Sequence, residues 1–181
     1  MNFSELVKKR QSTRKYSDRR VDRGLIDKCL EAARLAPSAR NSQPWSFIVI
    51  DDPTTIQKIS ESAFTGIYKS TRFAGRAPVL IVVITEKADY ITRMGNHLRN
   101  TKYSLIDIGI AGEHLVLQAE ELGLGTCWLG WFSARGVRKA LNLPKSTRID
   151  VLISLGYPLD PNYQKERRRH SLDKIRRYYQ P

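Results

Sequence analysis

The sequence is poor in the residues that build disulfide frameworks and metal sites. It has two cysteines, Cys29 and Cys127, and three scattered histidines, His97, His114 and His170, in 181 residues. No cysteine or carboxylate stands at metal-ligand spacing from a histidine. The cysteines lie in a helical pattern and in an apolar run. We therefore expect no metal site and no disulfide, as is typical of a protein in the reducing cytoplasm.

Long apolar runs are also missing. No stretch approaches the roughly 20 residues that a membrane-spanning helix needs, and the N-terminal sequence MNFSELVKKR has no signal-peptide apolar region. With 41% hydrophobic residues, the chain can still bury a sizeable core. No repeat or linker divides it. We therefore expect a single domain over residues 1–181, located in the cytoplasm and without a membrane partner.

Acidic residues are scarce relative to basic ones. The 31 lysines and arginines outnumber the 18 acidic residues and give a net charge of +13. The basic residues cluster near both ends, at positions 8–20 and 165–177. Such a balance suits nucleic acid, anionic small ligands or a solvated surface. The first cluster holds a single aromatic residue, Tyr16, and no nucleic-acid-binding motif is present, so nucleic acid stays an alternative that rests on charge alone.

Apolar spacing and turn residues predict an α+β fold with alternating elements. We expect helices over residues 3–9, 22–36, 54–63, 105–122 and 133–141, and strands over 45–50, 78–85, 126–132 and 149–155. Asp22 and Ser133 are the expected N-caps, and Gly123 ends the longest helix. Residues 65–76 read as a loop with some helix, the pattern over 90–100 is ambiguous, and a basic tail follows Pro158.

The segment Ala36-Pro-Ser-Ala-Arg-Asn-Ser-Gln-Pro-Trp45 is far more polar and rigid than a helix-to-strand joint requires. Its two prolines stiffen the backbone, and its amide, hydroxyl and guanidinium groups are then presented at fixed positions. Such a loop suits a flat polar ligand. A helix stop followed by a polar turn explains any one of these residues, but it explains the whole set poorly.

A second candidate site is Arg10-Gln-Ser-Thr-Arg14, directly after the first helix. Two arginines four residues apart, with a serine between them, can surround a phosphate with bidentate contacts and a hydroxyl donor. The alternative is a solvated basic helix end that is favoured by the helix dipole. From the motif alone, that alternative is the better account.

The run Gly123-Leu-Gly-Thr-Cys-Trp-Leu-Gly130 is not a dinucleotide fingerprint, because it follows a helix and has tryptophan at position 128. Gly130 could instead let a planar ring approach the main chain. Asp107, inside an apolar helix, is either a ligand contact or a buried carboxylate satisfied by backbone donors or an arginine. No acid–base or nucleophile pair is legible, and Cys127 has no activating neighbour, so a cofactor would carry the chemistry.

Taken in order, these motifs resemble the nitroreductase family of FMN-dependent oxidoreductases, in particular its short single-domain members. The resemblance rests on Arg10-x-Ser-x-Arg-x-Tyr16, the segment 36–45, Ala77-Pro78, Asp107-x-Gly-x-Ala111, the segment 123–130 and Leu155-Gly-Tyr-Pro158. It implies a central mixed sheet packed between helices, a homodimer with FMN at its interface, and a C-terminal extension onto the partner.

The resemblance also implies which residues would contact FMN. The phosphate and ribityl end would be bound by Arg10, Gln11, Ser12, Arg14 and either Arg167 or Arg169. The partner subunit would contribute Pro37, Ser38, Ala39, Arg40, Asn41 and Gln43. Trp128, Leu129 and Gly130 would bring a backbone N–H to flavin N5. Lys69 and Arg72 would reach the flavin from the loop before Ala77.

The implied reaction is a ping-pong hydride transfer from NAD(P)H through flavin N5 to a nitroaromatic, quinone or similar electron-poor acceptor. The same fold hosts other reactions, so dehalogenation, flavin cleavage and dehydrogenation stay open. A buried phosphate would account for part of the positive charge. The sequence identifies neither the acceptor nor the electron donor.

Overall fold

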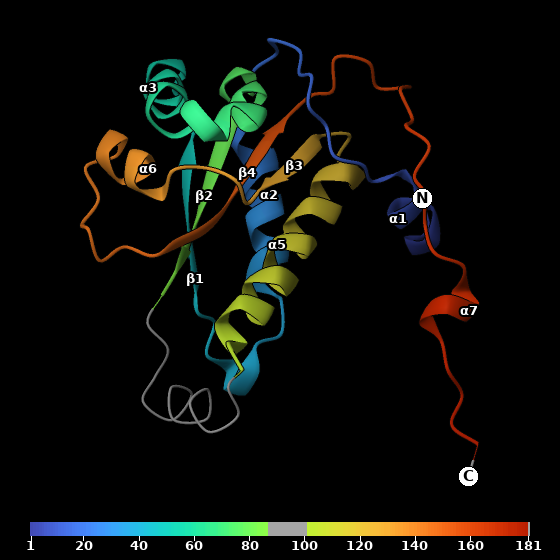
Figure 1. Ribbon diagram of the computed structural model, residues 1–181. Helices are drawn as coiled ribbons and strands as arrows, with labels where there is room; N and C mark the ends of the chain where they lie inside the picture. Colours follow the sequence, from blue (N-terminus) through green and yellow to red (C-terminus); the bar gives the residue numbers. More distant parts are fainter. Residues whose placement is uncertain (87–100, 181) are drawn as a thin grey trace.

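The computed structural model describes residues 1–86 and 101–180. It contains one four-stranded sheet in the order β1-β2-β4-β3 (Figure 1), formed by β1 (Trp45–Ile50), β2 (Val79–Thr85), β3 (Gly125–Leu129) and β4 (Ile149–Gly156). The α+β fold is confirmed. The resemblance implied a mixed sheet, whereas the four strands described in one chain all pair antiparallel. In the described residues, the parallel pairing is an isolated bridge between Ser12 and Thr126.

The helices follow the sequence pattern closely. They are α1 (Phe3–Lys9), α2 (Arg23–Arg34), α3 (Pro53–Ala63), α5 (Tyr103–Glu121), α6 (Ala134–Ala140) and α7 (Leu172–Ile175), with 3-10 segments η1 (Ala39–Asn41) and η2 (Gly66–Arg76). The short helix α7 in the tail is not predicted by the sequence. The ambiguous stretch 90–100 lies outside the described residues.

The sheet is buried on both faces, which explains the continuous apolar run of β2. Val79, Ile81 and Val83 belong to the core beneath α2 and α5. Leu80 and Val82 belong to the core beneath α3 and α6 on the other face. Each of these side chains is at most 1% exposed, and such burial is worth about 1.5–3 kcal/mol per side chain.

Caps fix the helix ends where the sequence predicts them. The Asp22 side chain accepts a hydrogen bond from the Gly24 amide at 2.8 Å and begins α2. Ser133 accepts one from the Gly136 amide at 3.1 Å and begins α6. Gly123 has a φ of 76° after α5, a left-handed conformation that favours glycine. These three expectations are confirmed.

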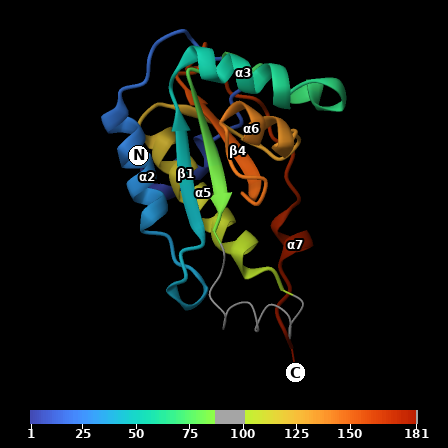
Figure 2. The ribbon, with the colours of Figure 1, turned by 90° about the vertical axis from the view of Figure 1, so that its left-hand side faces the viewer.

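Two segments contact α5 near its opposite ends. The loop between α2 and β1 contacts the beginning of α5, whereas α1 contacts its second half, and the C-terminal tail runs on past α1 to α7, away from the sheet (Figures 1 and 2). Lys9 and Arg10 mark the second contact, because they form ion pairs of 3.7 and 3.8 Å with Glu120 and Glu113. Within residues 1–86 and 101–180, no helix combines the length and apolar character needed to cross a membrane.

Candidate functional site

The segment after α1 is fixed by the sheet. Ser12 forms a bridge with Thr126 of β3, and the Thr13 amide donates to the Thr126 carbonyl at 2.8 Å. The Tyr16 hydroxyl lies 2.8 Å from both the Thr13 carbonyl and Ser154 Oγ of β4. Burial raises the pKa of Tyr16 above its ordinary value, so the phenol stays protonated and can donate. The motif is therefore held rigidly at the end of the sheet.

The C-terminal tail is held against this segment by two side chains. The Gln11 amide donates to the Tyr163 carbonyl and accepts from the Lys165 amide at 3.0 Å. The Arg167 guanidinium donates to the carbonyls of Lys8 and Arg10, the latter at 2.5 Å, and so caps the end of α1. We name these contacts of Gln11 and Arg167 the tail latch.

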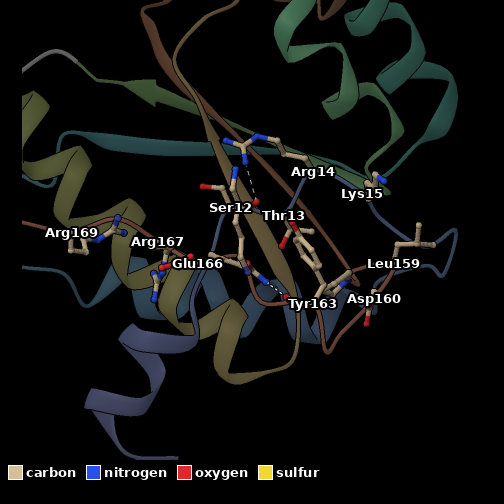
Figure 3. Close-up of a pocket in the computed structure, with 13 residues that line it drawn as sticks. Ser12, Thr13, Arg14, Lys15, Leu159, Asp160, Tyr163, Glu166, Arg167 and Arg169 are labelled. Carbon is tan, nitrogen blue, oxygen red and sulfur yellow. Dashed lines mark hydrogen bonds between the residues drawn. The ribbon is translucent and has the colours of Figure 1, made fainter.

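A cavity of about 730 Å³ opens between the segment and the tail (Figure 3). Its walls carry five cationic side chains and two carboxylates, the latter from Asp160 and Glu166. The lining residues are Gln11, Ser12, Thr13, Arg14, Lys15, Pro158, Leu159, Asp160, Tyr163, Lys165, Glu166, Arg167 and Arg169. In Figure 3, the Arg14 guanidinium turns back over Ser12 and donates a hydrogen bond to the Ser12 carbonyl at 3.4 Å. Its guanidinium carbon lies 5.8 Å from the centre of the Phe73 ring of η2. The cavity therefore favours anions.

A second basic cavity, of about 540 Å³, lies on the α5 side of the tail and includes Arg10. Arg167 and Arg169 line both cavities. Of the two tail arginines, Arg167 is occupied by main-chain carbonyls of α1, and Arg169 donates to the neighbouring Arg168 carbonyl. The structure thus distinguishes two arginines that the sequence could not.

The loop Ser38–Gln43 is built from backbone conformations that side chains rarely adopt. Arg40 and Asn41 have a φ of 56°, and Gln43 has a φ of 44°. The Gln43 amide donates to Ser38 Oγ at 3.0 Å, and the Gln43 side chain donates to the Asn41 carbonyl at 3.0 Å. Such strain persists only where surrounding contacts enforce it, and it concentrates at ligand sites. The rigidity that the sequence predicts for this loop stays a prediction.

Gly130 follows β3 and is exposed, and a Cβ built on it would meet no heavy atom within 4 Å. Packing within the described chain therefore does not require glycine there. Leu129 is 1% exposed and Trp128 packs against Gly112 of α5, so these two residues could offer a ligand mainly their backbone. A cofactor that approaches Gly130 is consistent with this arrangement.

Beside Gly130, exposed Trp131 is tied to η2. Its indole N–H donates to the Ile67 carbonyl at 2.8 Å, and Thr71 Oγ1 donates to the Trp131 carbonyl at 2.8 Å. Lys69 and Arg72 are exposed on the same 3-10 segment. This places η2 next to Gly130, although neither charged residue lines the two basic cavities.

The cysteines are unsuited to nucleophilic chemistry. Both thiols are free and buried. Burial raises the pKa of Cys29 to about 12 and also raises that of Cys127, although Arg14 opposes the latter shift. Neither forms thiolate readily near neutral pH. Among the described residues, no group of His, Cys, Asp or Glu is arranged to hold a metal ion.

The predicted site residues thus fall into separate groups within one chain. Gln11, Ser12, Arg14, Arg167 and Arg169 share a cavity, and Arg10 lies in the adjoining one. Residues 37–43, from Pro37 to Gln43, contact the other end of α5 and line neither cavity. The cavity also includes Lys15, Tyr163 and Lys165, which sequence reasoning did not assign; the clustering of basic residues at both ends was the available signal.

Comparisons with a family model and with known proteins identify relatives of this chain. The model of the nitroreductase family matches residues 7–72 and 68–157. A relative from Archaeoglobus fulgidus, provisionally named NADH dehydrogenase/NAD(P)H nitroreductase, is 36% identical over 86% of this chain and 85% of its own. Iodotyrosine deiodinase of Thermotoga neapolitana is 28% identical over 87% and 89%.

A solved structure of similar length extends this agreement to the fold. An FMN-dependent nitroreductase from Clostridium difficile superposes with a TM-score of 0.74, at 31% identity and over 96% of both chains. The resemblance seen in the sequence motifs is thereby confirmed along most of the chain. The protein belongs to the nitroreductase family.

Proposed function

We propose that this protein is an FMN-dependent oxidoreductase that uses NAD(P)H to reduce a nitroaromatic, quinone or similar electron-poor acceptor. The observation that carries the proposal is the cation-lined cavity at the Arg10–Arg14 segment, in a chain of this family. Arginine and serine donors suit a phosphate monoester, which needs several cations when it is removed from water.

The residues present fit FMN in two respects. The cavity supplies cations and the Ser12 hydroxyl for a phosphate, and Gly130 leaves open space where a planar ring could approach the main chain. When bound, FMN would supply the redox chemistry by accepting hydride at N5 and returning it to the acceptor in a ping-pong cycle. The chain itself would bind and orient the reactants and exclude water.

We assign each part of the chain a role in that arrangement. Arg10, Ser12 and Arg14 bind the phosphate end, and Arg169 joins them because Arg167 already caps α1. The backbone N–H at Gly130 donates toward the ring, which stabilises negative charge that develops there. Lys69 and Arg72 contribute positive charge from η2, which adjoins Gly130 through Trp131.

The loop Ser38–Gln43 would act from a second copy of the chain. In one chain it contacts the other end of α5 from the basic cavities, so a homodimer that brings it to the partner's cavity would complete the site. The tail beyond Pro158 would then extend onto the partner. We propose a single domain over residues 1–181 and a cytoplasmic location on the same basis of family membership.

The deciding experiment is the visible spectrum of the purified protein, recorded before and after anaerobic addition of NADH or NADPH. We expect flavin absorption that bleaches with one of these donors. Absorption that persists with both would remove NAD(P)H from the proposal. A colourless protein that also fails to take up added FMN would overturn it, and salt-dependent binding to DNA or RNA would then be tested.

Gly130→Val tests where the ring lies. A Cβ at Gly130 would meet no described heavy atom within 4 Å, so we expect the variant to fold normally and to lose FMN affinity. Normal FMN affinity in the folded variant would contradict this position of the ring.

Reductive dehalogenation is the second candidate. It is favoured by the relative named iodotyrosine deiodinase, which matches 87% of this chain. The two candidates differ in the acceptor, so the reduced protein should be mixed anaerobically with iodotyrosine and, separately, with a nitroaromatic. Release of iodide would identify dehalogenation, whereas reduction of the nitro compound alone would favour the first candidate.

A further inference from the structure

Asp107 is a buried carboxylate that the proposed chemistry does not use. It lies on α5 among apolar residues and is 3% exposed. Its Oδ1 accepts a hydrogen bond from the Ala39 amide at 3.0 Å. Its Oδ2 is buried and has no hydrogen-bond partner among the described residues. Burial of a carboxylate with one unpaired oxygen destabilises the folded state, so we expect Asp107 to have a role that offsets this cost.

The internal hydrogen bonds of the loop that Asp107 contacts fix its shape but not its position on α5. Among the described residues, the other hydrogen bonds of residues 38–42 stay inside the segment 38–43. The bond from Ala39 to Asp107 alone reaches another element. Three left-handed residues make the loop conformation unfavourable unless it is anchored, at a cost of order 1 kcal/mol or more for each.

We propose that Asp107 is a positioning residue that fixes the loop Ser38–Gln43 through the Ala39 N–H, and so sets the direction in which Arg40 and Asn41 face the ligand. The anchoring part rests on geometry alone. The part that concerns the ligand rests on the proposed function, because it takes FMN as the group that the loop contacts.

The anchoring is tested by tryptic cleavage after Arg40 under native conditions, which needs no ligand. Asp107→Ala should speed this cleavage about tenfold, as expected when the acceptor of a buried amide is lost. Asp107→Asn keeps an oxygen that can accept from Ala39, so its rate should stay within about threefold of the parent. Glu121→Ala removes an exposed carboxylate from the far end of α5 and should leave cleavage unchanged.

A second variant removes the same bond from the other side. Ala39→Pro deletes the N–H at the first residue of η1, where proline is tolerated, and leaves the carboxylate in place. It should speed cleavage as Asp107→Ala does, and the double variant should be no worse than either single variant. The Ala39→Pro single variant tests the anchoring even if Asp107→Ala fails to fold.

FMN titration of the stripped protein tests the ligand part. Asp107→Ala should bind FMN about tenfold more weakly, and Asp107→Asn should restore most of the affinity. Unchanged cleavage in both Asp107→Ala and Ala39→Pro would overturn the anchoring. Equal loss in the Ala and Asn variants would also overturn it, because the acceptor would then not be the cause. Faster cleavage with unchanged FMN affinity would overturn the ligand part, and a parent that binds no FMN would refute the proposed function while leaving the cleavage result valid.

Discussion

The basic cavity and the loop Ser38–Gln43 are two halves of one proposed site, but they are held by different means. The cavity is closed by the tail latch, whose hydrogen bonds join residues about 150 positions apart. The loop is held by bonds within six residues and by one buried carboxylate. The first half therefore depends on docking of a distant segment, and the second on local conformation. Each half should fail in its own way when it is perturbed.

The largest effect is expected from removing the cations of the first half. Arg10→Ala combined with Arg14→Ala should lower FMN affinity about 100-fold or more, because each arginine can contribute about 1.5–3 kcal/mol through hydrogen bonds to phosphate. Cleavage after Arg40 should not change. Fluorescence titration with FMN measures the affinity.

The matched control for that pair is Arg23→Ala combined with Arg34→Ala. These arginines pair on the surface with Asp51 and Glu31, outside both cavities, so the control loses the same charge. An equal loss of FMN affinity in the control would show that net charge, rather than local contact, binds the phosphate.

The second half should respond to backbone chemistry at Arg40. Valine resists a φ of 56°, so Arg40→Val should lower the free energy of unfolding by about 1–2 kcal/mol. Arg40→Gly relieves the strain but loosens the unfolded chain, so it should stay near the parent. Urea denaturation compares the two variants. A valine variant as stable as the glycine variant would mean that the loop is not strained at this residue.

A smaller effect should follow from opening the tail latch. Gln11→Ala removes two hydrogen bonds to the tail, so trypsin should cut after Lys165 about fivefold faster. Cleavage after Arg40 should be unaffected, which separates the two halves within one digest. Gln57→Ala, on α3 and bonded only to Glu61 in the described residues, is the control. Mass spectrometry of the fragments gives both rates.

The smallest effect concerns pH in the first half. Burial raises the pKa of Glu120, although Lys9 opposes the shift from 3.7 Å. Because the folded pKa lies above the unfolded one, Glu120 favours the folded state below its unfolded pKa, and this contribution is lost as pH rises through the folded pKa. As pH rises from 4 to 7, the free energy of unfolding of Glu120→Gln should therefore increase by up to about 1 kcal/mol relative to that of the parent.

Asp51 provides the opposite sign for comparison. Arg23 lowers the pKa of Asp51, so the stability that Asp51 contributes is present above its unfolded pKa and is lost as pH falls through the folded pKa. Asp51→Asn should therefore be slightly less stable than the parent at neutral pH, and this difference in the free energy of unfolding should disappear at acid pH. Unfolding by urea at pH 4 and pH 7 measures both variants, and parallel curves for the parent and Glu120→Gln would contradict the shift at Glu120.

The sequence was sufficient for elements whose signals are local. Asp22 and Gly123 mark helix ends through their own chemistry, and the apolar run of β2 announces a strand that is buried on both faces. Strand direction was not predictable, because it depends on how distant strands meet. The short helix α7 was missed because four residues in a polar tail carry no usable periodicity.

In the candidate site too, the parts with local sequence signals were predictable and the parts that depend on distant contacts were not. Motifs such as Arg10–Arg14 and residues 36–45 were recognisable because their residue types are unusual where they occur. The different hydrogen-bond partners of Arg167 and Arg169 were not predictable, because they depend on which main-chain carbonyls lie within reach. The anchor at Asp107 was only half visible: the sequence indicated a buried carboxylate but not its partner at Ala39.

The pairing of the segment after α1 with the last strands has a consequence for the order of events during protein synthesis. Ser12 bonds to Thr126 of β3, and Tyr16 pairs with Pro158, just beyond β4. At about 5–20 residues per second, a ribosome needs roughly 7–28 s to travel from Tyr16 to Pro158. During that interval the segment after α1 has been made, but its pairing partners at Thr126 and Pro158 are not both present. The basic cavity at residues 11–15 can therefore form only after nearly all of the core has been translated.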